Sequence, residues 1–143
     1  MTNLPAISIV VPSFNQARFI GETLQSLVDQ QYPNLKVLIQ DGGSTDGSVD
    51  IARGFVERHP AVFDLVVEKD SGQADALNRA FARAKGDVLG FLNSDDTLLP
   101  NVLHRVAAVT HNDPSETRSV TNSTADRCNR MTAAVAPTDS IMP

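Results

Sequence analysis

The sequence predicts an α/β fold, a mostly parallel sheet flanked by helices, on the basis of three observations. Short β-branched and leucine-rich runs alternate along the chain with amphipathic segments of helical period. Clusters of Gly, Ser, Asp and Pro separate the two kinds of segment. The connections are short, as in parallel sheets built from right-handed crossovers. In such sheets ligands bind beyond the carboxyl ends of the strands, so the loops after the strands are the candidate sites.

Four segments are predicted as buried strands because each is a short apolar run bounded by turn residues. They lie at residues 7–11, 35–39, 63–67 and 87–92, and Pro12 closes the first. Four further segments place apolar residues at helical spacing. These residues are Ile20, Leu24, Leu27 and Val28; Ile51, Ala52, Phe55 and Val56; Ala74, Leu77, Phe81 and Ala84; and Val102, Leu103, Val106 and Val109. Gly86 stands where a C-terminal cap belongs, and Pro100 where the last helix can begin.

The regular pattern ends near Thr110. No glycine, phenylalanine or leucine occurs from Thr110 to Pro143. A segment so poor in large apolar groups cannot offset the entropy lost on ordering. We therefore predict one ligand-binding domain at residues 4–109 and an irregular, disordered tail at 110–143. Our hypothesis for the tail is a frameshifted or prematurely ended reading frame.

Charge and composition exclude several classes of protein. The formal net charge of −5 argues against a protein that binds nucleic acid, which would present a basic face. A small anionic ligand is compatible with this charge if a metal ion accompanies it. The single cysteine, Cys128, excludes an internal disulfide. No apolar run is long enough for a signal peptide or a membrane span, so we expect a cytoplasmic protein.

Three polar clusters follow the first, second and fourth predicted strands. They are Pro12–Asn15, Asp41–Ser48 and Asn93–Asp96. Each alone also fits a turn or a helix cap. The topology, however, gathers all three at one edge of the sheet. Adjacent glycines allow close approach to a ligand, and paired carboxylates suit Mg²⁺ or Mn²⁺.

From Ile7 to Val109 the chain resembles the nucleotide-binding N-terminal portion of family 2 glycosyltransferases of the GT-A fold. Four stretches in order carry this resemblance. They are Ser8–Asn15 (SIVVPSFN), Asp41–Ser48 (DGGSTDGS), Ala76–Asp87 with its ALN and AKGD ends, and Phe91–Asp96 (FLNSDD). The Gly-rich signatures of dinucleotide-binding and P-loop proteins are absent from the sequence.

The resemblance implies a nucleotide-diphosphate sugar donor, with a UDP-sugar as the first expectation. It also implies a divalent metal, Mg²⁺ or Mn²⁺, and, for the full-length relative, an acceptor glycan or lipid-linked sugar. The expected location of the chain is the cytoplasm, including the inner face of the membrane as a peripheral protein. The implied donor-binding residues are Pro12, Ser13, Asn15, Asp41, Gly43, Asp46 and Ser94. The implied metal ligands are Asn93, Asp95 and Asp96.

Two positions depart from the family pattern. Gly42 replaces a second aspartate that many members carry, and Asn93 replaces the first aspartate of the D-x-D element. In this family the general base comes from the C-terminal portion of the enzyme. We assign no residue of this chain to that role, so the catalytic residue stays unassigned. We therefore expect a truncated domain in which donor binding outlasts transfer.

Two alternatives stay open at this point. One is a non-catalytic remnant with at most weak nucleotide binding. The other is a different metal-dependent α/β enzyme, such as a nucleotidyltransferase or a phosphatase-like hydrolase. Against the hydrolase, no acidic nucleophile follows the first strand.

Overall fold

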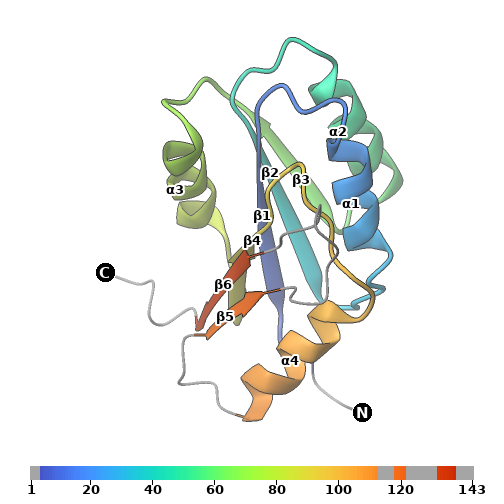
Figure 1. Cartoon of the computed structure of the whole chain (residues 1–143), viewed down its shortest axis with the longest axis vertical. Helices are drawn as coiled ribbons and strands as arrows, with labels where there is room; N and C mark the ends of the chain where they lie inside the picture. Colours follow the sequence, from blue (N-terminus) through green and yellow to red (C-terminus); the bar gives the residue numbers. More distant parts are fainter. Residues whose placement is uncertain (1–3, 113–117, 122–131, 138–143) are drawn as a thin grey trace.

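The computed structural model describes residues 4–112, 118–121 and 132–137, and within them strands and helices alternate (Figure 1). The strands are β1 (Ile7–Ser13), β2 (Leu35–Asp41), β3 (Phe63–Val67), β4 (Val88–Phe91), β5 (Arg118–Thr121) and β6 (Thr132–Pro137). The helices are α1 (Ile20–Val28), α2 (Ser48–Arg58), α3 (Gln73–Arg83) and α4 (Val102–Asn112). The predicted α/β fold is confirmed, and every predicted strand and helix is present.

The sheet has the strand order β3-β2-β1-β4-β6-β5. β1 pairs in parallel with β2 and β4, and β2 pairs in parallel with β3. The carboxyl ends of these four strands therefore meet at one edge, uppermost in Figure 1. β6 runs antiparallel to β4, and β5 runs antiparallel to β6.

Alternation along β1 directs its side chains to two different helical layers. Ile7, Ile9 and Val11 belong to the larger core cluster, which includes buried residues of α1, α2 and α4. Val10 belongs to a second cluster with residues of α3 such as Ala80. Because successive residues of a strand face opposite sides, the sheet is covered by α3 on one face and by the other three helices on the opposite face. Both layers exclude water from the sheet that supports the loops.

Pro12 lies inside β1, whereas the sequence predicted that it would close this strand. The carbonyl of Val10 accepts from the N–H of Leu92, and that of Ser13 accepts from the N–H of Gly42, both at 2.9 Å. The backbone N–H and C=O groups of the even-numbered residues of β1 therefore point toward β4. The pairing of β1 with β4 ends at Phe91, opposite Val10. Pro12 lacks an N–H only on the side where no partner strand remains, so β1 continues at little cost.

The tail differs from the expected irregular chain in the parts that the structure describes. α4 continues to Asn112, beyond the expected boundary at residue 109. Residues 118–121 and 132–137 form β5 and β6. Without β6, β4 would be an edge strand with unpaired backbone N–H and C=O groups. Such groups can pair with another strand whatever side chains that strand carries. The prediction of disorder for the rest of the tail lies outside the described residues. Among those described, no helix is long and apolar enough to cross a membrane.

Gln30 is a buried amide that joins α1 to the start of α4. Its side chain is 2% exposed, donates to the carbonyl of Leu99 at 2.7 Å and accepts from the N–H of Leu103 at 3.1 Å. We predict that Gln30→Met lowers the free energy of unfolding by about 1–3 kcal/mol, because two buried backbone groups lose their partners. Urea unfolding measures this change. The matched control is Gln25→Met on the exposed face of α1, which should stay within about 0.5 kcal/mol of wild type.

Candidate functional site

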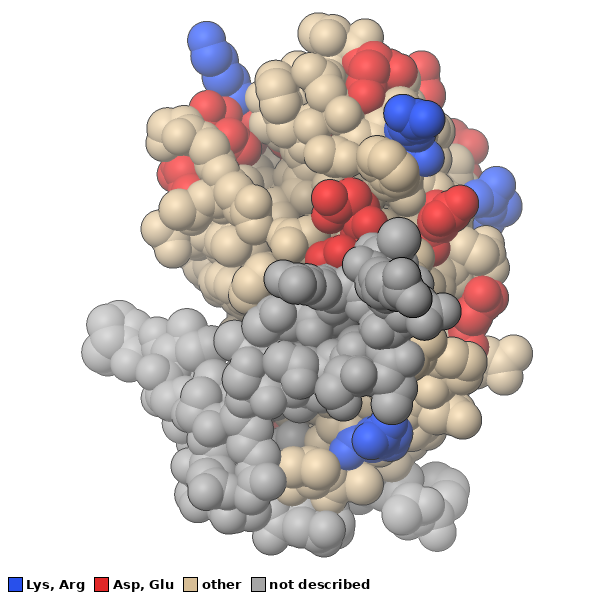
Figure 2. All heavy atoms as spheres, viewed as in Figure 1, with Lys and Arg blue, Asp and Glu red and all other residues tan. Residues whose placement is uncertain are grey.

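An open pocket of about 520 Å³ lies at the edge where the four parallel strands end. It is lined by the exit of β1, the end of β2, the β3–α3 loop and the loop after β4. The lining residues are Pro12, Ser13, Phe14, Gln16, Gly42, Lys69, Asp70, Ser71, Gly72, Gln73, Ala76, Asn93, Ser94 and Asp95. Figure 2 shows acidic side chains on the upper part of the molecule, where this edge lies. The pocket has the size of an ordinary small-ligand site.

The loop after β1 is tied to the loop after β2 by side chains that were expected to bind the donor. The N–H of Asn15 donates to Ser44 Oγ at 2.8 Å, and the Asn15 carbonyl oxygen Oδ1 accepts from the N–H of Thr45 at 2.9 Å. Asp46 Oδ2 accepts from the N–H of Ala17 at 3.0 Å. Hydrogen bonds from the hydroxyl of Ser48, and then from Ala17, hold the pKa of Asp46 below its usual range. These contacts fix the rim of the pocket without lining it.

Asp41 is also engaged within its own loop. It is 1% exposed, and its Oδ1 accepts from the N–H groups of Gly43 and Ser44 at 2.8 and 2.7 Å. Its Oδ2 accepts from Ser44 Oγ at 2.7 Å. A buried carboxylate needs such donors, and here they fold the glycine turn back on the end of β2. The carboxylate therefore shapes the turn from which Gly42 reaches the pocket.

The loop after β4 is anchored from two sides. Thr23 of α1 donates its hydroxyl to the carbonyl of Ser94 at 2.9 Å. Gln73, at the start of α3, donates its amide to Asn93 Oδ1 at 2.8 Å. Asp95 follows these anchored residues, is exposed, and lines the pocket. The loop thus presents one carboxylate to the pocket from a fixed backbone.

The carboxylates of the loop after β4 fit a divalent cation that a bound ligand also coordinates. Asp95 offers hard carboxylate oxygens, and half-buried Asp96 follows it. Burial, and then the charge of Asp95, raise the pKa of the Asp96 carboxyl. Within the described part of the chain, no three His, Cys, Asp or Glu side chains gather as a complete metal site. A cation held here would take its other ligands from phosphate and water, as Mg²⁺ commonly does.

Half of the predicted site residues line the pocket. Those that line it are Pro12, Ser13, Asn93, Ser94 and Asp95. Those outside its lining are Asn15, Asp41, Gly43, Asp46 and Asp96. The hydroxyl of Ser13 is buried and has no hydrogen-bond partner among the described residues. It is therefore a polar group at the pocket wall whose bonding capacity is unused.

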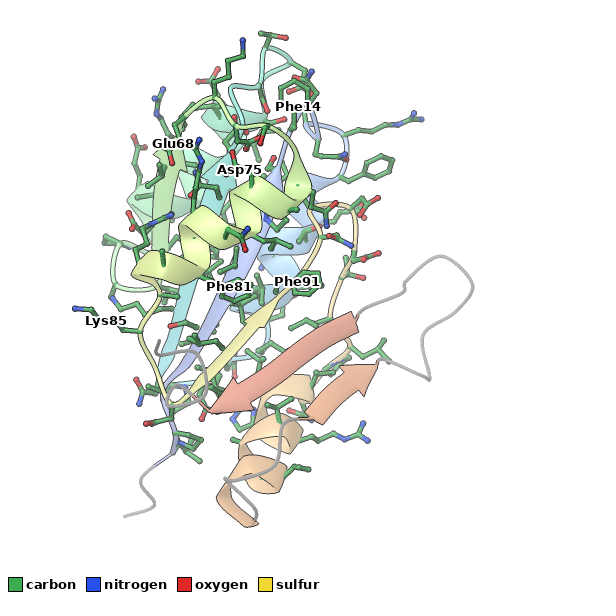
Figure 3. The ribbon with its side chains drawn as sticks, turned by 90° about the vertical axis from the view of Figure 1, so that its left-hand side faces the viewer. Phe14, Glu68, Asp75, Phe81, Lys85 and Phe91 are labelled. Atoms are coloured by element: carbon green, nitrogen blue, oxygen red, sulfur yellow. The ribbon has the colours of Figure 1, made fainter. Side chains whose placement is uncertain are left out.

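The sequence interpretation missed the β3–α3 loop. Residues 69–73 all line the pocket, although Asp70–Gly72 was predicted only as a turn. The rule that directs attention to the loops after strands applies to β3 as it does to its neighbours, and would have found them. Phe14 was also passed over. It lines the pocket, is 58% exposed, and lies at the carboxyl-end edge of the sheet in Figure 3.

The fold and the site together define an α/β domain with a metal-compatible ligand pocket at the carboxyl ends of its parallel strands. The model of the family described as "Glycosyl transferase family 2" matches residues 8–122. The chain belongs to glycosyl transferase family 2. The resemblance to family 2 glycosyltransferases that the sequence indicated is therefore confirmed.

Several relatives and solved structures are similar to the chain. The putative teichuronic acid biosynthesis glycosyltransferase TuaG of Bacillus subtilis is 38% identical over 97 residues, which are 67% of this chain and 38% of that protein. The mannosyltransferase PcManGT of Pyrobaculum calidifontis, solved with GDP-Man and Mn²⁺, has a TM-score of 0.71 at 32% identity. The match covers 81% of this chain and 35% of that one.

A second solved structure is S. aureus TarS in complex with UDP-GlcNAc. It has a TM-score of 0.70 at 27% identity, over 78% of this chain and 33% of that one. The chain spans about a third of the length of the curated relatives that it matches. Both solved neighbours contain a nucleotide sugar, and one also contains a divalent metal.

Proposed function

We propose that this chain binds a nucleotide-diphosphate sugar together with Mg²⁺ or Mn²⁺, for transfer of the sugar to an acceptor hydroxyl in glycan or polysaccharide synthesis. A UDP-sugar is the first candidate, and a GDP-sugar is the second because PcManGT was solved with GDP-Man. The acceptor is a glycan or a lipid-linked sugar. We assign the general base of the transfer to no residue of this chain.

One observation carries the proposal: the pocket at the carboxyl-end edge has a carboxylate, Asp95, at the end of β4 and an exposed aromatic ring, Phe14, at the end of β1. A nucleotide diphosphate can use both kinds of group. A metal beside Asp95 can neutralise the diphosphate, and the ring offers a surface on which a base can stack. Lys69 adds a positive charge to the pocket wall.

Asp95 is the residue that we expect to hold the metal, with Asp96 beside it and Asn93 adjacent. The bound metal would stabilise the negative charge that develops on the diphosphate leaving group. Asn93 Oδ1 accepts a hydrogen bond from the side-chain amide of Gln73, and this contact fixes the direction of the Asn93 amide. The anchored backbone of residues 93–95 would hold the metal-binding carboxylate in place before the donor arrives.

Calorimetric titration of UDP and of GDP into the purified chain, with and without Mn²⁺, tests the proposal. We expect binding of at least one of the two, strengthened tenfold or more by the metal. UMP, which lacks the second phosphate, should gain much less from Mn²⁺. A folded chain that binds neither diphosphate in the presence of metal would contradict the proposal and favour a non-catalytic remnant.

We predict that Phe14→Ala weakens nucleotide binding about 10- to 100-fold, because stacking of a base on an aromatic side chain contributes about 1–3 kcal/mol. The ring is 58% exposed, so its removal should leave the unfolding free energy nearly unchanged. Calorimetry with UDP and GDP measures the effect. The matched control is Phe19→Ala, since Phe19 is 43% exposed but lies outside the pocket lining. Equal affinities for both variants would rule out stacking on Phe14.

A further inference from the structure

The loop after β4 has few hydrogen bonds of its own. Residues 92–101, between β4 and α4, form neither helix nor strand. Within this segment the N–H of Asp96 donates to the carbonyl of Asn93 at 3.0 Å, and no other backbone hydrogen bond joins two residues of the segment. Buried backbone groups that lack a partner in a ladder need one elsewhere. The position of this loop therefore depends on side chains of neighbouring elements.

Three of those side chains lie on one face of α1. Thr23, Ser26 and Gln30 are three and four positions apart, so they form a row along the helix. The hydroxyl of Thr23 donates to the carbonyl of Ser94 at 2.9 Å. Ser26 Oγ accepts from the N–H of Leu98 at 3.1 Å, and Gln30 holds the start of α4. Figure 1 shows the segment, coloured yellow to orange, running beside α1 on its way to α4.

α1 is a fixed support for this row of side chains. Ile20, Leu24 and Leu27 belong to the larger core cluster and are 0% exposed, as is Thr23 itself. Rotation or sliding of the helix would break this packing, and closely packed cores resist such movement. The hydroxyl of Thr23 therefore has one position relative to the sheet.

Thr23 makes the contact of this row that lies nearest to Asp95 along the chain. The Ser94 carbonyl that accepts its hydrogen bond belongs to the same peptide group as the N–H of Asp95. A peptide group is planar, and the Cα atom of the following residue lies in its plane. The hydrogen bond from Thr23 therefore helps to set the direction in which the chain enters Asp95, and with it the place of the Asp95 carboxylate in the pocket.

We propose that Thr23 is a positioning residue for the divalent metal: its hydroxyl holds the Ser94–Asp95 peptide in the orientation in which Asp95 takes a cation bound to a diphosphate. The proposal rests on the proposed function, which assigns the metal to Asp95. Thr23 is fully buried and does not line the pocket, so it acts through Ser94. Removal of a group that orients a metal ligand typically lowers metal affinity about 10- to 100-fold. A purely structural contact would lower stability and leave the metal dependence of binding unchanged.

The test measures by calorimetry the affinities for UDP and GDP, with Mn²⁺ and with EDTA in its place. Thr23→Val keeps the shape of the side chain and removes the hydroxyl. We expect it to reduce the strengthening of binding by Mn²⁺ about tenfold, with the metal-free affinity within twofold of wild type. Thr23→Ser keeps the hydroxyl and should restore the strengthening to within twofold of wild type.

Gln30→Met is the matched control, because it breaks contacts between α1 and the same segment at the end far from Asp95. It leaves two buried backbone groups without their partner, whereas Thr23→Val leaves one. It should therefore lose more stability in urea unfolding and still keep the strengthening by Mn²⁺ within twofold of wild type. A loss of strengthening equal to that of Thr23→Val would overturn the proposal, since general loosening of the segment would then be the cause.

The remaining outcomes separate this proposal from the proposed function. If Mn²⁺ strengthens binding to wild type and to Thr23→Val equally within twofold, or if Thr23→Ser restores nothing, the role of Thr23 is overturned and the proposed function stands. If folded wild type binds neither nucleotide with Mn²⁺, both are overturned. Should Thr23→Val fail to fold, Thr23→Cys replaces it, because a thiol is a weaker donor than a hydroxyl. Its strengthening by Mn²⁺ should lie between those of wild type and Asp95→Ala, and a value equal to wild type would overturn the role of Thr23.

Discussion

Asp95→Ala should abolish the strengthening of nucleotide-diphosphate binding by Mn²⁺, so that affinity falls at least tenfold, to the level of wild type without metal. The physical reason is that Asp95 is the carboxylate of the loop after β4 that lines the pocket. The described residues offer no group of three acidic, histidine or cysteine ligands to replace it. A metal that depends on one or two carboxylates plus the diphosphate cannot stay in place when its main protein ligand is removed. Calorimetric titration of UDP and GDP at several Mn²⁺ concentrations measures the effect.

The matched control for this prediction is Asp64→Ala, which makes the same change of charge on β3, outside the pocket lining. It should retain the full dependence on Mn²⁺. UMP should bind wild type and Asp95→Ala with similar affinity, since the interaction through the second phosphate is missing in both cases. If Asp95→Ala retained metal-dependent binding of UDP or GDP, the metal would have to be held elsewhere, and the assignment of Asp95 would fail.

The fold could be predicted because its physical causes are local. Each parallel strand is buried on both faces and so appears as a continuous apolar run, as in residues 35–39. Each helix covers one face and so shows a 3.6-residue period, as in Ile20, Leu24 and Leu27, all of which are fully buried. Where the prediction failed locally, a neighbour was responsible. Pro12 stays in β1 only because β4 ends before reaching it.

The tail shows the limit of this reasoning. The segment 132–137 pairs with β4 at Val88 and Leu89, through the antiparallel register of its backbone. Its sequence, TAAVAP, has no large apolar residue and no clear alternation, so side-chain patterns could not reveal it. An available sheet edge is a property of the folded molecule that the sequence of the strand itself does not show.

The candidate site was predictable as a place but less so as a set of contacts. The rule for parallel sheets places the pocket at the carboxyl ends of the strands from the sequence alone. It could not tell whether a polar side chain faces the ligand or its own loop. Asp41 and Asp46 have the chemistry of ligand-binding residues, yet their oxygens accept from Ser44, Ser48 and nearby N–H groups. The same chemistry serves both uses, and only the three-dimensional partners distinguish them.

The contact of Gly42 with Asp70 was hidden for a similar reason. A Cβ built at Gly42 would lie 2.9 Å from Asp70 Oδ2. In the sequence, Gly42 appears as a lost aspartate, and Asp70 appears as part of a turn. The two residues are 28 positions apart, and they meet because β2 and β3 are neighbours that end at the same edge. A departure from a family pattern is therefore best interpreted after asking which neighbouring side chain fills the space.

Gly86 is the position at which a single methyl group should cost the most stability. Its φ is +156°, and a Cβ there would lie 3.0 Å from the carbonyl oxygen of Ala6. That oxygen accepts from the N–H groups of Asp87 and Val88 at 2.8 and 3.0 Å, where β4 joins β1. The sequence predicted Gly86 as a helix cap, but α3 ends at Arg83 with Ala84 as its C-cap in an extended conformation. Gly86 instead allows the chain to pass close to Ala6 as it enters the sheet.

We expect Gly86→Ala to lower the free energy of unfolding by about 2–4 kcal/mol, from backbone strain and from displacement of the first β4–β1 contacts. Gly54→Ala should do the opposite. Gly54 lies within α2, and a Cβ there would meet nothing within 4 Å, so alanine should stabilise the helix by about 0.5–1 kcal/mol. Urea unfolding of the two variants measures both changes against wild type. Changes of opposite sign in the free energy of unfolding would separate steric exclusion at Gly86 from the general effect of alanine on an unfolded chain. If Gly86→Ala were instead stabilised, β4 would be able to enter the sheet without this close approach to Ala6.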